Sequence, residues 1–492
     1  MGSSAGGMPG SAGSMAGGGA GPSSGAAGGS AGSQVDDGRP GRSLIRRLSN
    51  LEYDATIRTL FGDSSGYAAA FPTDSVVNGF TNNTDVQDVG PALAEQFLVV
   101  AEQVAAKATQ NPDTLLGCKL ADGETCIQSF IERFGQRAWR RPLEAVERED
   151  LLGVFRAGSA AHGPTQGLKL LLETFLVSPS FLYRVEVGTP IADQPYLALT
   201  SWEVASRLSY FLTGAMPDDA LFSAAAAGGL LTPESIATEA KRLLATPAAR
   251  QQVADFFSGW LNLRAVERLE RDPAAFPGWS STLPPLLAEE TRAFATQVIF
   301  SGPGDLKTLL TAPYTYGNPA LAGLYGGTAG PVQDGVARIE LPTSQRAGLL
   351  TQISFLASHA KEIQANPVCA TCHRLIDPVG LAFENYDAAG GWREQEQGQP
   401  IDSSGDLTNT DVSGPINGVV AMAGKLAQSE IATECFVRNW FRFTFGRGEG
   451  DEEATRMTTI TADFRAADGK VLELLIALTK TPDFRYLAKQ VP

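Results

Sequence analysis

The chain has 492 residues, of which 43% are hydrophobic, and its 39 basic and 54 acidic residues give a net charge of −15. This hydrophobic share is that of an ordinary globular protein and excludes a mostly disordered chain. The acidic balance makes nucleic acid an unsuitable partner, since phosphate binding needs a basic surface. No apolar run approaches the roughly 18 residues that a bilayer-spanning helix needs, so we expect no membrane-spanning segment.

The chain opens with residues 1–41, a segment rich in glycine, serine and alanine that consists almost entirely of these residues from Met1 to about Gln34. This composition provides no apolar face to bury, so packing cannot offset the entropy lost on ordering. We predict a disordered tether, which would suit a protein held at the cell surface; a low-complexity segment without a role is the alternative. No signal peptide is recognisable in it, so an exported form would have lost one or would start further upstream.

Helical periodicity dominates from residue 42 onwards. Apolar residues recur at helical steps between Leu48 and Phe61, with Ser49 as the expected N-cap and Gly62 as the expected stop. Similar amphipathic stretches cover residues 91–108, 127–139, 143–157, 166–186, 199–212, 233–245, 247–263, 283–300, 344–360, 417–428, 430–445, 453–465 and 470–481. Alternating strand patterns are scarce, and residues 375–409, rich in glycine and aspartate, are expected to form an ordered loop. The predicted fold class is therefore mainly α.

The helices fall into three predicted blocks, at residues 42–190, 195–340 and 341–492. The glycine-rich stretch 322–330 is the best candidate for a hinge or linker. It lacks the Gly-Lys-Ser/Thr ending of a phosphate-binding loop, so a nucleotide site there is not expected.

The cysteines outside the third block form one closely spaced pair. Cys118 and Cys126 lie eight residues apart, which predicts a disulfide that closes a small loop where a helix begins; a pair of inert thiols is the alternative. Cys435 stands beside Phe436 and near Trp440 on a predicted helix, so we expect a buried free thiol there.

The pentapeptide Cys369-Ala370-Thr371-Cys372-His373 has the spacing of a c-type haem attachment motif. Two thiols one helical turn apart can add to the two vinyl groups of one porphyrin, and the adjacent imidazole then ligates the iron. We predict one haem c, held covalently by Cys369 and Cys372, with His373 as the proximal iron ligand. Covalent haem and disulfides both belong outside the cytosol, which favours a periplasmic, cell-surface or secreted protein.

Two other uses of a Cys-x-x-Cys pair compete with haem attachment. A zinc site would need two more ligands, and neither the remaining cysteines nor His162 and His359 form a second half-site. A thioredoxin-like dithiol would need a βαβ setting, whereas the surroundings are helix and loop. Haem attachment is therefore the leading interpretation.

A sixth iron ligand would decide the chemistry of the haem. Met422 lies on the apolar face of a predicted helix and is our candidate for the distal ligand, with Met457 and His359 as further candidates. A Met/His pair favours electron transfer at raised potential, whereas an open position allows small-molecule chemistry.

The acidic loop after the motif offers two further arrangements. Glu384, Asp387 and Arg393 would form an ion-pair network around the haem, with a solvated charged loop as the equal alternative. A calcium site is conceivable from three aspartates, but their spacing matches no known loop. These are Asp402, Asp406 and Asp411.

Several further motifs resemble a family of exported proteins from planctomycetes and myxobacteria, whose chains are series of domains of unknown function with a single c-type haem motif. The matching segments follow the family's order: 46–53, 56–62, 71–74, 78–80, 137–143, 178–184, 206–212, 217–218, 369–373, 376–380, 383–387, 392–393, 401–405, 435–442 and 446–447. The resemblance implies an exported haem protein with a cytochrome c-like C-terminal region, but it implies no reaction.

The leading functional hypothesis is a c-type cytochrome that passes single electrons through one haem to an unidentified redox partner protein. The helical blocks before residue 341 exceed what one haem needs, so a haem-dependent oxidoreductase with an unknown substrate is the second hypothesis. A surface interaction module with a structural haem is the third. No Ser-His-Asp set, zinc-protease motif or nucleotide loop is recognisable, and no catalytic residue is assigned.

Overall fold

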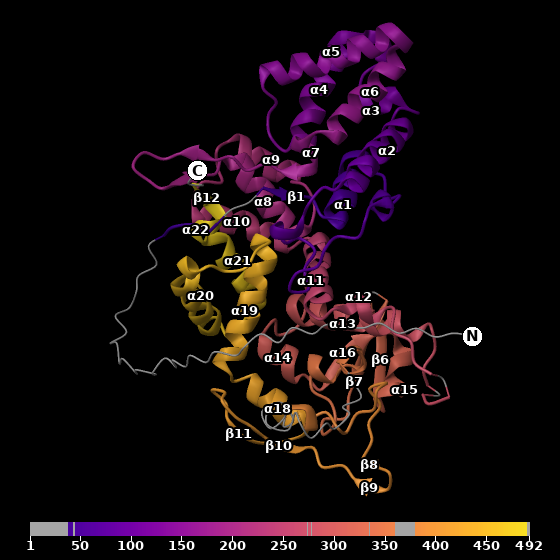
Figure 1. The fold of residues 1–492 in the computed structure, drawn as a ribbon, viewed down its shortest axis with the longest axis vertical. Coiled ribbons are helices and arrows are strands. Elements are labelled where there is room, and N and C mark those ends of the chain that lie inside the picture. The colour runs from indigo at the N-terminus through magenta and orange to yellow at the C-terminus, as the bar shows by residue number, and fades with distance from the viewer. Residues whose placement is uncertain are drawn as a thin grey trace, which may run out of the picture. The chain divides into compact units, whose positions relative to one another are not determined.

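The computed structural model describes residues 38–42, 45–272, 274–276, 278–333, 335–359 and 379–489. Residues 1–37 of the predicted tether and the whole predicted haem motif lie outside these ranges. The described chain is mainly helical, as predicted, with short strands between the helices (Figure 1). Within the described ranges, no helix combines the length and the apolar character that crossing a bilayer requires.

The first part of the described chain packs its helices around one apolar cluster, which includes Tyr53, Phe97, Phe134 and Phe175. Its elements are β1 (Arg46–Arg47), α1 (Asn50–Phe61), η1 (Tyr67–Ala70), η2 (Thr84–Val86), α2 (Pro91–Ala108), α3 (Pro112–Leu116), η3 (Leu120–Asp122), α4 (Glu124–Trp139), α5 (Ala145–His162), α6 (Pro164–Val177) and α7 (Pro179–Leu182).

Helix α1 begins and ends where the sequence predicts. The Ser49 hydroxyl accepts a hydrogen bond from the Glu52 backbone N–H at 3.3 Å, and the Glu52 carboxylate accepts one from the Ser49 N–H at 2.9 Å. This reciprocal capping box satisfies two N–H groups that have no partner within the helix. At the other end Gly62 adopts a left-handed conformation, with φ of 68°. Glycine pays no steric cost in that region, so the helix stops there.

The middle of the described chain continues with helices and short strands of three small sheets. Its elements are β2 (Tyr183–Arg184), β3 (Thr189–Pro190), β4 (Tyr196–Ala198), α8 (Ser201–Thr213), α9 (Asp219–Ala226), α10 (Pro233–Leu244), α11 (Pro247–Trp260), α12 (Leu263–Val266), α13 (Leu283–Phe300), α14 (Leu306–Thr311), β5 (Tyr314–Gly317), η4 (Pro319–Leu321), α15 (Ala322–Tyr325), β6 (Thr328–Gln333) and β7 (Val336–Glu340).

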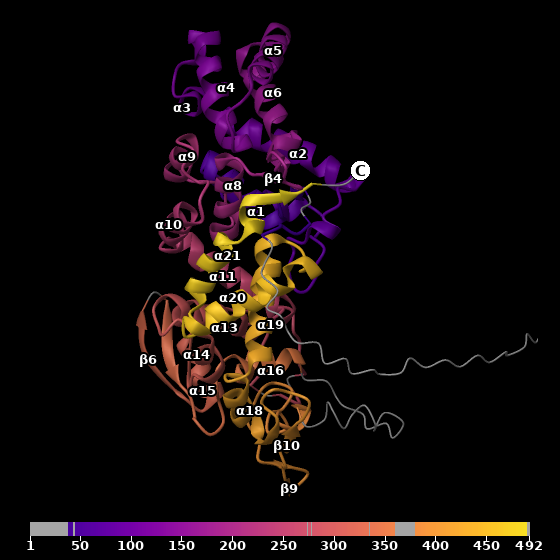
Figure 2. The ribbon, with the colours of Figure 1, turned by 90° about the vertical axis from the view of Figure 1, so that its left-hand side faces the viewer.

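The glycine-rich stretch 322–330 is not the hinge or linker that its composition suggested. It forms α15 and the start of β6, and β6 joins β7 and β5 in a three-stranded antiparallel sheet (Figure 2). Gly326 ends α15 with a φ of 61°, and a Cβ at Gly327 would collide with the carbonyl oxygen of Glu340 on β7. The glycines therefore serve a helix end and a close approach of two backbones, which composition alone does not distinguish from flexibility.

The last part of the described chain returns to the earlier helices. Its elements are η5 (Leu349–Thr351), α16 (Ile353–His359), β8 (Gln395–Glu396), β9 (Gln399–Pro400), β10 (Ser404–Leu407), β11 (Gly414–Asn417), α18 (Gly418–Leu426), α19 (Glu430–Phe445), η7 (Asp451–Glu453), α20 (Ala454–Ala466), α21 (Val471–Lys480), α22 (Pro482–Arg485) and β12 (Tyr486–Ala488). Helix α21 packs on α10 and α19 packs on α11, while β12 pairs antiparallel with β4 (Figures 1 and 2).

The largest apolar cluster joins the middle and last parts of the chain. It includes residues of α8, α10 and α11 together with residues of α19, α20 and α21. At its centre the rings of Phe256 and Trp440 are stacked, with centroids 3.6 Å apart and an interplanar angle of 8°. This cluster draws on both the second and the third predicted block, whose exact boundaries stay a prediction.

Candidate functional site

Two described segments flank the predicted haem motif. Helix α16 precedes it, and the described chain resumes at Val379. Leu356 of α16 and Ala382 and Tyr386 from the later segment belong to one apolar cluster, which we call the flanking cluster. The two described stretches on either side of the motif therefore pack together.

Met422, the predicted distal ligand, lies in this flanking cluster. Helix α18 buries Val419, Met422 and Ala423, which are spaced so that they share one face, and Met422 is only 3% exposed. The hairpin of β10 and β11 adds Leu407 and Ile416 to the same cluster. Ligation of iron by Met422 stays a prediction, because His373 lies outside the described residues.

The other candidate ligands are placed differently. Met457 is 2% exposed and packs in the largest apolar cluster, which does not contain Met422. The side chain of His359 lies outside the described residues, and His162 is exposed at the last position of α5. Met422 is thus the candidate methionine that shares a cluster with the segments beside the motif.

The loop after the motif holds part of the predicted ion-pair network. Arg393 contacts the Glu384 carboxylate at 3.3 Å and the Glu396 carboxylate at 2.8 Å. Asp387 instead accepts hydrogen bonds from the backbone N–H groups of Ala389 and Gly391, each at 2.8 Å. Asp387 therefore shapes the turn, and the ion pairs form around Arg393 without it.

An indole donor in this loop tests whether the surroundings fit a haem. Trp392 packs edge-on against Tyr386, with ring centroids 5.3 Å apart. Its buried Nε1–H has no acceptor among the described residues. An apolar cluster with one orphaned donor at its edge fits a flat apolar group that carries carboxylates, as haem does.

A buried carboxyl group lies behind α16. Glu290 of α13 is 0% exposed, and Tyr325 donates a hydrogen bond to its Oε2 at 2.9 Å. The Tyr325 hydroxyl also accepts a hydrogen bond from the backbone N–H of Ile353, the first residue of α16, at 2.9 Å. Burial raises the pKa of Glu290 to about 7, although hydrogen bonds from Tyr325 and Thr315 oppose this rise.

Arg346 connects this carboxyl group to the loop after the motif. Its guanidinium lies 4.9 Å from the ring centre of Tyr325 and 4.8 Å from that of Tyr386. It donates hydrogen bonds to the carbonyl oxygens of Thr351 at 2.9 Å and Gly390 at 2.8 Å. One buried cation thus binds both η5, just before α16, and the 386–390 turn.

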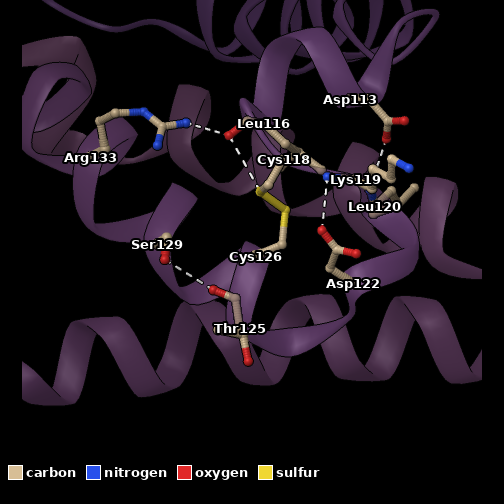
Figure 3. The surroundings of a disulfide bond; sticks show 10 residues. All are labelled: Asp113, Leu116, Cys118, Lys119, Leu120, Asp122, Thr125, Cys126, Ser129 and Arg133. Atoms are coloured by element: carbon tan, nitrogen blue, oxygen red, sulfur yellow. Dashed lines mark hydrogen bonds between the residues drawn. A yellow bond between two sulfur atoms is a disulfide. The ribbon is translucent and has the colours of Figure 1, made fainter.

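The predicted disulfide between Cys118 and Cys126 is confirmed, with Cα atoms 5.9 Å apart (Figure 3). It closes the short segment that leads into α4. Arg133 of α4 donates a hydrogen bond to the carbonyl oxygen of Leu116 at 2.5 Å, and the Asp113 carboxylate accepts one from the backbone of Leu120 at 2.8 Å. Polar contacts therefore hold the same loop that the disulfide closes.

The expectation of a buried Cys435 is wrong, because this thiol is free and exposed. Helix α19 buries Phe436, Val437, Trp440 and Phe441, and Cys435 lies just outside that stripe. Neighbouring positions on a helix point about 100° apart, so being next to a buried residue does not bury a side chain.

No group of three His, Cys, Asp or Glu side chains in the described part of the chain is arranged to hold a metal ion. Asp402 accepts a hydrogen bond from the Ser404 backbone at 2.9 Å, and Asp411 accepts one from the Ser429 hydroxyl at 2.7 Å beside the start of α19. Asp402, Asp406 and Asp411 therefore form no calcium site. The disulfide also removes Cys118 and Cys126 as zinc ligands.

A separate cleft of about 510 Å³ opens along α11, α12 and α13. Charged side chains from all three helices line it, among them Asp255, Arg264 and Arg292. Arg292 donates a hydrogen bond to the Ser258 hydroxyl at 2.8 Å and pairs with Glu267. Burial raises the pKa of Asp255. The cleft has the size and charge to hold a polar molecule. Its lining residues belong to other parts of the sequence than the flanking cluster does.

Comparison with known proteins finds family models along most of the chain. Each carries the description of a protein of unknown function: DUF1587 over residues 46–110, DUF1595 over 126–186, DUF1592 over 199–326, DUF1588 over 361–396 and DUF1585 over 414–484. The chain is a series of domains of unknown function. This confirms that part of the resemblance. No curated protein and no solved structure gives a match.

Sequence reasoning missed two buried charged residues, Glu290 and Arg346. A signal for Glu290 existed, because it falls in line with Leu287 and Phe294 on the apolar face of α13. An acidic residue among the apolar residues of a helix face can be buried, or it can mark a place where that face reaches solvent. Periodicity alone does not distinguish these two cases.

Proposed function

We propose that this protein is an exported c-type haem protein that transfers single electrons through one covalently bound haem. Cys369 and Cys372 would hold the porphyrin and His373 would ligate the iron, as the spacing of the pentapeptide requires. That spacing is the observation that carries the proposal. Bound haem would supply a one-electron redox couple.

Two findings support this proposal. The family model over residues 361–396, which includes the pentapeptide, has the short name PSCyt3, which contains the usual abbreviation of cytochrome. The disulfide between Cys118 and Cys126 is typical of proteins folded outside the cytosol.

The described residues would pack against the porphyrin and position the segments on either side of the motif. The flanking cluster would exclude water from one side of the porphyrin, and Met422 is the proposed distal ligand within it. Arg346 would hold η5, which precedes α16, and the 386–390 turn in place on either side of the motif in the sequence.

Maturation of the chain together with a cytochrome c assembly apparatus tests the proposal. We expect a pyridine haemochrome spectrum and a mass increased by one haem, both lost in a Cys369→Ala/Cys372→Ala variant. Cys435→Ser is the matched control, because it removes an exposed thiol outside the motif and should keep the haem. Colourless wild-type protein of unmodified mass would refute the proposal.

The distal ligand has its own test. Met422→Leu should abolish the absorption band of a sulfur–iron bond, since leucine fills a similar volume without a sulfur ligand. Met457→Leu is the control for loss of a buried methionine elsewhere in the core. An unchanged spectrum in Met422→Leu would exclude Met422 as the ligand.

The cleft along α11, α12 and α13 favours the second candidate function, a haem-dependent oxidoreductase. A charged cleft with a partly buried acid could bind a substrate, which a simple electron carrier does not need. Catalytic oxidation of added donors that is lost in Asp255→Asn, with the haem spectrum unchanged, would favour this candidate. Redox cycling without turnover would favour the carrier, and haem that neither cycles nor turns over would indicate a structural group.

A further inference from the structure

The cleft along α11, α12 and α13 continues into a second one. This second cleft, of about 270 Å³, is lined by residues of α1 and α11, among them Arg58 near the end of α1. Four residues line both clefts, so the two clefts meet at them, and we call these four residues the junction. They are Leu51, Gln251, Asp255 and Arg264.

The turn between α11 and α12 brings two opposite charges to the junction. Helix α11 ends at Trp260, and Asn262 then adopts a left-handed conformation with a φ of 52°. Asparagine enters this region more readily than most residues with a side chain. Helix α12 begins directly after this turn and packs on both α11 and α13 (Figure 1). Asp255 of α11 and Arg264 of α12 therefore line the same opening.

Neither of these two charges has an ion-pair partner among the described residues. The Asp255 carboxylate accepts a hydrogen bond from the Gln251 amide at 3.1 Å. In the same part of the chain, the Arg264 side chain forms neither a hydrogen bond nor an ion pair. Burial raises the pKa of Asp255, and the charge of Arg264 opposes this rise without a direct contact. A ligand between the two side chains would contact both.

The other carboxylates that line the two clefts are already paired with arginines. Binding of a ligand therefore does not require these pairs to break. They are Glu52 with Arg46, and Glu267 and Glu289 with Arg292.

The junction also presents an apolar side chain. Leu51 is 49% exposed, at the second position of α1. A single exposed leucine is ordinary on a protein surface. Leu51, however, lies where the two clefts meet, so a ligand with an apolar part would remove it from water.

We propose that the junction binds a small organic carboxylate that carries a hydroxyl or ammonium group beside the carboxylate, as hydroxy acids and amino acids do. The guanidinium of Arg264 would donate two parallel hydrogen bonds to the ligand carboxylate. The Asp255 carboxylate would accept a hydrogen bond from the hydroxyl or ammonium group, and Leu51 would pack on the apolar part. This inference concerns binding alone and does not rest on the haem.

Isothermal titration calorimetry on the full matured chain tests the proposal with ligands of similar shape. Phenyllactate and phenylalanine carry both groups, phenylpropionate lacks the hydroxyl or ammonium group, and phenethylamine lacks the carboxylate. We expect phenyllactate, phenylalanine or both to bind at least about ten-fold more tightly than the other two, because each of those leaves one charge of the junction without a partner. Equal affinity for all of these ligands, or binding of none, would overturn the proposal.

Variants assign the two contacts and distinguish the two kinds of ligand. Arg264→Gln should weaken the binding of either ligand at least about ten-fold. Asp255→Asn keeps an acceptor but removes the charge, so it should weaken phenylalanine more than phenyllactate. Arg268→Gln is the matched control, because Arg268 is exposed on the same segment and lines neither cleft. Wild-type affinity in Arg264→Gln would overturn the proposal.

The comparison of ligands on the wild type needs no variant, so the proposal stays testable if a variant does not fold. Its outcome is also separate from that of the haem test. Colourless protein that binds phenyllactate or phenylalanine would refute the haem and keep this site. Coloured protein that binds neither would refute this site alone.

Discussion

The buried carboxyl group of Glu290 predicts a specific pH dependence of stability. Its pKa is about 7 in the folded protein, against an ordinary value of 4.5. The folded state therefore holds this proton more tightly than the unfolded state, so the contribution is complete below pH 4.5 and is lost as pH rises through 7. A difference of this size corresponds to about 3 kcal/mol in the free energy of unfolding.

Comparison with Glu290→Gln isolates this effect from the other titrating groups. Glutamine resembles the protonated carboxyl group and does not ionise. The difference in unfolding free energy, wild type minus variant, should fall by about 3 kcal/mol between pH 4.5 and pH 8. Urea denaturation followed by circular dichroism at each pH measures it.

A neighbouring glutamate provides the control. The side chain of Glu289 is 62% exposed on the same helix, so Glu289→Gln should follow the wild-type pH dependence closely. Parallel curves for the wild type and Glu290→Gln over this pH range would refute the reasoning, because they would show that Glu290 titrates alike in both states.

Three other substitutions follow from local geometry. Ser49→Ala removes the capping box of α1 and should cost about 0.5–2 kcal/mol in urea unfolding, whereas no loss would exclude a role for this cap. Cys118→Ser/Cys126→Ser should cost about 2.5 kcal/mol by loop entropy, and dithiothreitol should lower the stability of the wild type but not of the variant. Phe256→Ala removes the ring stacked on Trp440 and should cost about 3–5 kcal/mol, and a calorimetric loss below 1 kcal/mol would contradict this packing.

Long helices with a clear apolar face were predictable from the sequence. Residues 91–108, 283–300 and 430–445 are helical over the predicted ranges, because periodicity and capping agree there. The sheet of β5, β7 and β6 was missed. Its strands are short, β6 is fully exposed, and glycines interrupt the alternation that would mark a strand.

The candidate site was predictable only in part. The disulfide between Cys118 and Cys126 followed from spacing, since a short loop brings two thiols together whatever the rest of the fold. Glu186 pairs both with the nearby Arg184 and with Arg207 of α8, and a sequence does not show which distant segments meet. Arginine is also mostly a surface residue, so its burial is the less expected outcome. The predicted haem ligands stay a prediction.

The pairing of β12 with β4 bears on how the chain reaches its native state. Tyr486 stands opposite Ala198, so a stretch of almost 290 residues separates the two partners in the order of synthesis. Loop closure over such a distance is entropically costly and slow. Until the residues around Tyr486 have left the ribosome, β4 lacks its partner strand β12. Helix α8 and its neighbours then also lack some of the C-terminal side chains that pack on them. The newly made chain thus remains incompletely folded until late in translation.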